Sequence, residues 1–73
     1  MFNALKLRGK MVEKQITVEM MASRLGINPV TLYRKTTGKS EFTRSEIQVI
    51  TDILALSMQE VKDIFFADEL TET

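Results

Sequence analysis

The chain has 73 residues, 44% of them hydrophobic, so it can form one domain with a single small core but no second folded unit. It contains neither cysteine nor histidine, which excludes disulfide bonds, thiolate or imidazole metal ligands, and catalysis by the commonest general base. Its formal net charge is zero, which by itself does not indicate a nucleic-acid partner.

Charge is distributed unevenly along the chain. Residues 1–44 include nine basic and three acidic residues, a net charge of +6, whereas residues 45–73 include one basic and seven acidic residues, a net charge of −6. This asymmetry favours one face that attracts a polyanion and another that does not. The alternative is that ordinary surface charge happens to be arranged in this way.

The first predicted helix runs from a cap at Asn3 to Lys14. Its apolar residues recur at spacings of three, four or seven, as one face of a helix requires. Gly9 lies inside it and costs up to about 1 kcal/mol relative to alanine. The predicted face consists of Leu5, Leu7, Met11 and Val12.

A second helix is predicted to begin after Thr17, a good cap, with Glu19 in the first turn, where the helix macrodipole favours an acid. It is expected to end at Gly26, because glycine readily adopts the left-handed conformation that closes a helix. Its inner face consists of Met21, Ala22 and Leu25.

A third helix is predicted only two residues later. Asn28 is a capping residue, and Pro29 suits the first helical position, where its missing N–H is no loss. The helix is expected to span 29–36 and to stop before Gly38. A helix, a tight glycine turn and a second helix form a helix-turn-helix, in which Ala22 allows the helices to cross and Leu32 reaches back into the core.

The segment Thr17–Lys39, TVEMMASRLGINPVTLYRKTTGK, resembles the helix-turn-helix of the phage repressor and Cro family, also called the Xre-type family. The resemblance implies an all-α, five-helix, lambda-repressor-like domain over residues 1–67 that binds duplex DNA and regulates transcription. The run from Lys39 to Thr43 is similar to small regulators encoded in phages and prophages of Gram-positive bacteria. The matched positions are Thr17, Glu19, Ala22, Leu25, Gly26, Ile27, Thr31, Leu32, Arg34, Gly38 and Lys39.

The sequence also departs from the family pattern. Met20 and Met21 stand where many relatives have a polar residue and leucine, a difference that concerns packing. Val18 stands where many have glutamine, so a side-chain contact with phosphate is missing. Lys35 and Thr36 occupy a stretch where a large apolar residue usually anchors the end of the third helix.

The third helix is expected to lie in the major groove, with its first turns against the base edges. Because Leu32 points inward, the side chains predicted to face the bases are those of Pro29, Val30, Tyr33 and Arg34. The fork of Arg34 suits O6 and N7 of guanine, and Val30 and Pro29 offer apolar surface to a thymine methyl. The alternatives are a solvated Arg34 and a Tyr33 ring half-buried against a neighbouring helix.

Phosphate contacts are expected on both sides of that helix. Positive and hydroxyl side chains neutralise or bind phosphates, and free backbone N–H groups are expected around Gly38. The start of the second helix provides a further clamp on the strand across the groove. The predicted contacts are Thr17, Asn28, Thr31, Lys35, Thr37, Lys39, Ser40 and Arg44.

The remaining residues are predicted to be structural. Thr43–Glu46 and Ser57–Glu60 are capping boxes that open a fourth and a fifth helix, and Phe42 is expected to anchor the preceding loop in the core. Phe66 is expected either in an exposed apolar patch or folded over the end of the core. Residues 68–73 are expected to form a flexible acidic tail. The predicted inner stripes are Ile47, Ile50 and Leu54, then Val61, Ile64 and Phe65.

The expected partner is double-stranded DNA, bound by a possible homodimer that uses the fourth and fifth helices with Phe65 and Phe66. No cofactor, metal, membrane or small-molecule substrate is expected, and the protein is expected in the cytoplasm, associated with the nucleoid. An enzyme is disfavoured because no acidic pair has a convincing catalytic spacing. The alternative function is a protein-interaction module, an antirepressor or adaptor, that keeps the scaffold without binding DNA.

Overall fold

The computed structural model describes residues 2–66, which form five α-helices and no strand. The all-α, five-helix prediction is therefore confirmed. Within these residues no helix has the length and apolar character needed to cross a membrane. The predicted tail at 68–73 lies outside the described residues. The helices are α1 (Ala4–Glu13), α2 (Val18–Leu25), α3 (Pro29–Thr36), α4 (Arg44–Leu54) and α5 (Met58–Phe65).

Each helix begins at its predicted cap, whose side-chain oxygen accepts a hydrogen bond from a backbone N–H two or three residues later. Such a bond satisfies a donor that the helix leaves unpaired and contributes about 1 kcal/mol. The two predicted capping boxes are both present, with Glu46 and Glu60 accepting from the cap's own N–H. The caps are Asn3, Thr17, Asn28, Thr43 and Ser57.

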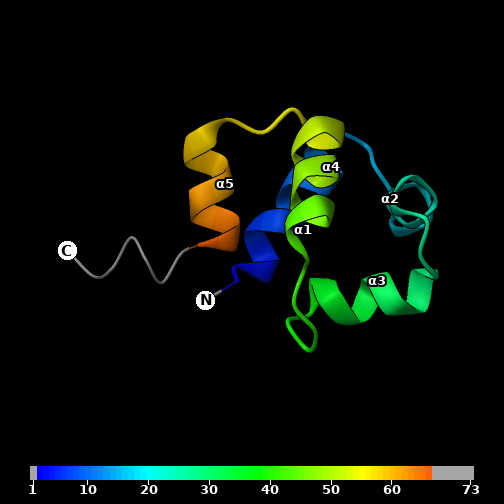
Figure 1. Cartoon of the computed structure of the whole chain (residues 1–73). Coiled ribbons are helices and arrows are strands. Elements are labelled where there is room, and N and C mark those ends of the chain that lie inside the picture. The colour runs from blue at the N-terminus through cyan, green and yellow to red at the C-terminus, as the bar shows by residue number, and fades with distance from the viewer. Residues whose placement is uncertain (1, 67–73) are drawn as a thin grey trace.

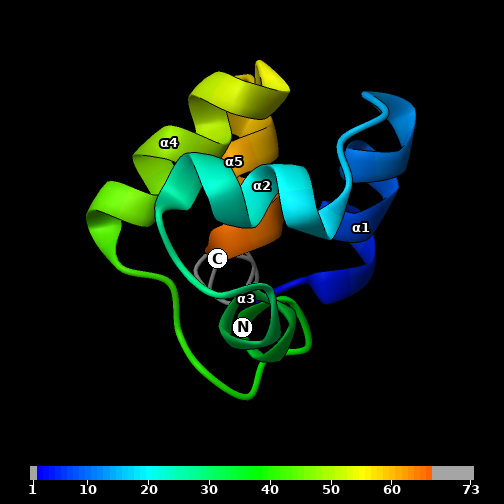
Figure 2. The same ribbon diagram turned by 90° about the vertical axis from the view of Figure 1, so that its right-hand side faces the viewer.

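The helices enclose one small apolar core. α2 packs against α3 and α4, and α1 packs against α5 and α3. Seen from two sides, α3 and the loop that follows it form the lower edge of the molecule (Figures 1 and 2). The buried hydrophobic residues are Leu7, Met11, Met21, Ala22, Leu32, Ile50, Leu54, Leu56 and Ile64.

The predicted apolar face of α1 is correct for only two of its four residues. Leu7 and Met11 are buried, but Leu5 and Val12 are 79% and 77% exposed. Leu5 and Leu7 are two residues apart, so their side chains are rotated by about 200° around the helix axis. Leu7 and Met11 therefore form one stripe, which meets the core, and Leu5 and Val12 form another, which does not. Spacings of four and seven identify a shared stripe without showing which stripe faces inward.

Gly9 lies on the exposed surface of α1, and a Cβ added there would meet no atom within 4 Å. Gly9→Ala is therefore expected to stabilise the protein by about 0.5–1 kcal/mol, because alanine loses less backbone entropy in a helix. Thermal unfolding followed by circular dichroism should show a Tm higher by several degrees. Gly26→Ala is the control: Gly26 has φ of +70° at the end of α2, so alanine there should lower Tm. An unchanged or lower Tm for Gly9→Ala would contradict the prediction.

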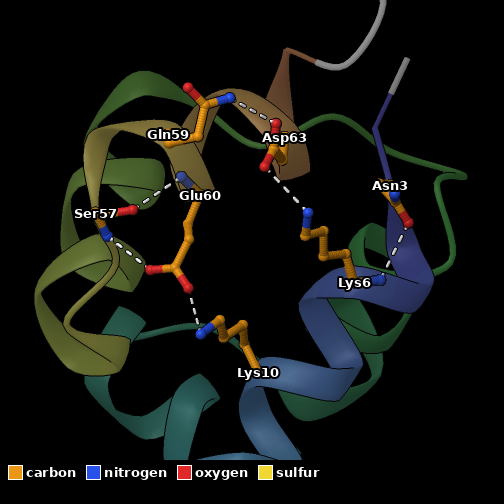
Figure 3. A network of polar contacts seen from close by, with 7 residues as sticks. All are labelled: Asn3, Lys6, Lys10, Ser57, Gln59, Glu60 and Asp63. Atoms are coloured by element: carbon orange, nitrogen blue, oxygen red, sulfur yellow. Dashed lines mark hydrogen bonds and ion pairs between the residues drawn. The ribbon is translucent and has the colours of Figure 1, made fainter.

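A polar network fastens α1 to α5 (Figure 3). The Lys6 ammonium lies 3.0 Å from Asp63 Oδ2, and the Lys10 ammonium forms an ion pair with Glu60. Glu60 also accepts from the Ser57 N–H at 2.8 Å, so one carboxylate both caps α5 and binds α1. The hydrogen bond from Lys10, together with that from Ser57, lowers the pKa of Glu60 from its ordinary 4.5 to about 2.

Stability should therefore depend on Glu60 in acid. A carboxylate whose pKa is lowered on folding stabilises the protein above its unfolded pKa, and this contribution is lost as the pH falls from about 4.5 to about 2. Glu60→Gln keeps the capping box but does not titrate. We expect the wild-type Tm to exceed that of Glu60→Gln at pH 6 and the two to converge near pH 2. A difference in Tm that does not change with pH would refute this.

The predicted role of Phe42 is confirmed, since its half-buried ring packs between Phe2 and Phe65 with ring centroids 5.4 and 5.6 Å apart. Phe65 also lies 5.8 Å from Phe2, which completes a three-ring cluster within the chain. Phe66 is 38% exposed. Of the two alternatives for Phe66, the exposed position is the one observed.

Candidate nucleic-acid interface

The helix-turn-helix forms as the local sequence predicts. Gly26 adopts the left-handed conformation with φ of +70° and ends α2. Asn28 then accepts a hydrogen bond from the Val30 N–H at 2.8 Å, and Pro29 occupies the first turn of α3. Two residues therefore suffice to redirect the chain. The helix ends at Thr36 as predicted, although the apolar anchor usual at its end is absent.

The outer face of α3 is open to solvent. Leu32 is fully buried, which fixes the orientation of the helix, while Val30 is 60% exposed and Tyr33 58% exposed. Pro29 and Arg34 are also exposed. All four residues predicted to read bases are thus accessible to solvent. Their contact with bases stays a prediction.

Tyr33 of α3 and Thr17 at the start of α2 face the same hollow. This hollow of about 520 Å³ lies between α1, the start of α2 and α3. Arg8 of α1 lines the same hollow, a cation that the sequence reasoning did not include in the interface. Its only sequence signal was its membership of the basic half of the chain. The start of α2 therefore flanks α3, as the predicted phosphate clamp requires.

The remaining predicted phosphate contacts differ in accessibility. Thr37 is half-buried, and its hydroxyl donates to the Arg34 carbonyl oxygen at 2.9 Å. The Thr17 hydroxyl accepts from the Met20 N–H at 3.1 Å, which leaves its own hydrogen able to donate. The residues that are exposed are Thr17, Asn28, Thr31, Lys39, Ser40 and Arg44.

The prediction of free backbone N–H groups around Gly38 is wrong for residues 37–39. The N–H groups of Thr37, Gly38 and Lys39 donate to carbonyl oxygens in the last turn of α3, at 3.1, 3.1 and 3.0 Å. Gly38 has φ of +86°, which lets the chain reverse and close the helix on itself. These three donors close the end of the helix and are not available to a phosphate.

Lys35 requires a correction. Its side chain is only 13% exposed, and its ammonium lies 2.9 Å from Glu46 Oε1, so the structure turns it inward and not toward a phosphate. Thr36, beside it, is buried, and its hydroxyl donates to the Tyr33 carbonyl oxygen at 2.8 Å. Both polar side chains at the end of α3 are thus satisfied within the chain.

The electrostatics of the exposed surface suit an anion. From Asn28 to Ser40 the sequence contains three basic residues and no acidic one. Arg34 and Lys39 are exposed, whereas Lys35 is paired. Glu41 is the first acid after the helix, and it is exposed. The described residues contain no group of three acidic side chains that could hold a metal ion.

Comparison with known proteins identifies one family. The sequence pattern of the Cro/C1-type HTH DNA-binding domain matches residues 6–65, which include most of α1 and all of α2, α3, α4 and α5. Neither a curated protein nor a solved structure is significantly similar to the chain.

Proposed function

The chain belongs to the Cro/C1-type helix-turn-helix DNA-binding family, and on that premise we propose how it contacts its operator. It is a sequence-specific DNA-binding protein that regulates transcription, and its family is not an enzyme family. This assignment favours DNA binding over the adaptor alternative. We place α3 in the major groove, with Pro29, Val30, Tyr33 and Arg34 against the base edges.

The observation that carries this proposal is the exposed outer face of α3, which presents Arg34 and no acidic residue and is oriented by the burial of Leu32. A major groove is wide enough for one helix, and its base edges carry a distinct donor and acceptor pattern for each base pair. The Arg34 guanidinium suits guanine, and the exposed Val30 side chain suits a thymine methyl. Each good bidentate pair discriminates by about 1–3 kcal/mol.

Phosphate contacts are proposed on both sides of α3. Thr17 holds one strand from the start of α2, assisted by the exposed Asn28 and Thr31. Lys39, Ser40 and Arg44 hold the other strand from the loop after α3 and the start of α4, with Thr37 beside them. Cations at phosphates release counterions, so affinity should fall steeply with salt.

A homodimer is proposed through α4 and α5. Phe65 is occupied by its ring cluster, so the proposed contact residues are Phe66, Met58 and Val61. Met58 is 74% exposed, and both Met58 and Phe66 line a hollow whose wall includes the apolar side chains of Ile47 and Val61. In a two-fold dimer both copies use the same surface. A surface that carries both projecting side chains and a hollow suits such a contact, because the side chains of each copy can enter the hollow of the other. Two copies would read half-sites about one helical turn apart.

Met58→Glu should disrupt this dimer. At an apolar two-fold contact the introduced carboxylates of the two copies are buried without a partner and lie near each other. The dissociation constant of the dimer should therefore rise by at least about tenfold. Sedimentation equilibrium over a range of concentrations measures it. Met20→Glu, an exposed methionine on α2, is the control and should leave association unchanged. A wild-type chain that stays monomeric at high concentration, with and without operator, would overturn the dimer.

The decisive experiment for the proposed operator contacts is selection from random duplexes followed by sequencing. We expect enrichment of a short site that contains guanine and is palindromic if two copies bind. The logarithm of the association constant for the selected duplex should fall linearly with the logarithm of the salt concentration. Failure to enrich any site at low salt would contradict the proposal. We also propose that the protein acts in the cytoplasm. The run from Lys39 to Thr43 further suggests that it is one of the small phage or prophage regulators.

A further inference from the structure

Lys35 makes three interactions at the end of the proposed recognition helix, all of them with other residues of the chain. Its ammonium donates to Glu46 Oε1 at 2.9 Å and to the Glu41 carbonyl oxygen at 3.0 Å. It also lies 5.8 Å from the centroid of the Phe42 ring, within the range of a cation–π interaction. A single side chain of α3 therefore reaches the loop and the first turn of α4.

Glu46 is fixed from both sides. Its Oε1 accepts from the Thr43 N–H at 2.8 Å as part of the capping box, and the same atom accepts from Lys35. Its side chain is only 15% exposed. Partial burial raises the pKa of Glu46, but the Thr43 N–H and the Lys35 ammonium outweigh it and hold the pKa below its ordinary value. The carboxylate is charged at neutral pH and couples α3 to α4.

We propose that Lys35 is a positioning residue of the DNA interface, whose pair with Glu46 sets the path of the loop between α3 and α4. This loop contains Lys39 and Ser40, two of the proposed phosphate contacts, and its N–H groups at Gly38 and Lys39 are already used to close α3. Lys35 fixes the far side of the same loop through the Glu41 carbonyl. The inference rests on the proposed operator contacts and assigns a new role to a residue that carries charge but does not touch DNA.

The competing role for Lys35 is a direct phosphate contact. The two roles predict opposite effects of neutralising Glu46. If Lys35 binds phosphate, Glu46 competes with DNA for its ammonium, and removal of the acid should strengthen binding. If Lys35 positions the loop, Glu46 is its anchor, and removal should weaken binding. A change in sign separates the two roles more clearly than a change in size.

Glu46→Gln is the test, because glutamine keeps the capping box and removes the charge. We expect affinity for the selected duplex to fall by about three- to tenfold, which is the size expected when one interaction between neighbouring residues is lost. Glu41→Gln is the matched control, since it removes an exposed acid in the same loop and leaves the Glu41 carbonyl in place. It should raise affinity slightly. Stronger binding by Glu46→Gln would overturn the inference.

A second pair of measurements guards against a loss caused only by reduced stability. Binding is measured well below the Tm of each variant, and amide spectra are compared. We expect shifts in Gly38, Lys39 and Ser40 for Glu46→Gln, and unmoved loop amides would contradict the inference. Lys35→Arg should retain binding, whereas Lys35→Met should lose it, and adding Glu46→Gln to Lys35→Met should cost nothing more. If the wild type binds no duplex, the proposed operator contacts fail as well; if only the Glu46 result has the opposite sign, they stand.

Discussion

Leu32→Ala is expected to leave much of the protein unfolded at 25 °C. Leu32 is completely buried at the centre of α3, where it holds the helix against the core. Removing a buried leucine side chain costs about 2–5 kcal/mol, and a core of this size supplies only about 3–5 kcal/mol in total. Urea unfolding followed by circular dichroism at 222 nm should show little or no folded baseline.

The chain provides a matched control for that result. Leu5→Ala makes the same chemical change in α1, but Leu5 is 79% exposed and should cost no more than about 0.5 kcal/mol. If both variants unfold at the same urea concentration, Leu32 does not fix α3 in the way described. Operator binding by Leu32→Ala should recover in part at saturating DNA, because a ligand that binds only the folded state stabilises it.

Arg34→Ala is expected to reduce affinity for the selected operator by about ten- to a hundredfold and to relax its guanine preference. The bidentate contact between a guanidinium and the guanine edge is worth about 1–3 kcal/mol of discrimination. Duplex selection should be repeated with the variant, and affinities should be measured on operators in which that guanine is replaced. The variant should bind the original and the substituted operator almost equally.

Arg34→Lys separates shape from charge. Lysine keeps the positive charge but lacks the planar fork, so the dependence of affinity on salt should be nearly that of the wild type while guanine preference weakens. A variant that keeps full guanine preference would place the base contact on another residue. Val30 and Tyr33, which share the same exposed face, are the next candidates.

The signals that predicted the fold are local in sequence. A cap acts on a backbone N–H two or three residues away, so Thr17, Asn28 and Thr43 mark their helices without reference to the rest of the chain. The left-handed Gly26 is local in the same sense. For these reasons the element order, the helix-turn-helix and the buried position of Leu32 could all be predicted.

The parts that could not be predicted depend on tertiary contacts. Lys35 seemed suited to phosphate because it is basic and lies beside Arg34, but Glu46, eleven residues away, pairs with it. Leu5 has the hydrophobicity of a core residue, yet whether its stripe of α1 meets the core depends on how α5 packs. Gln15 has φ of +58°, a left-handed conformation that glutamine does not signal.

The two ends of the described chain are fastened together by the Asn3 N–H, which donates to the Ile64 carbonyl oxygen at 2.7 Å. The first and last described residues of the chain therefore lie near each other. A short linker between the ends should be tolerated, so the chain is suited to circular permutation with new termini in a surface turn.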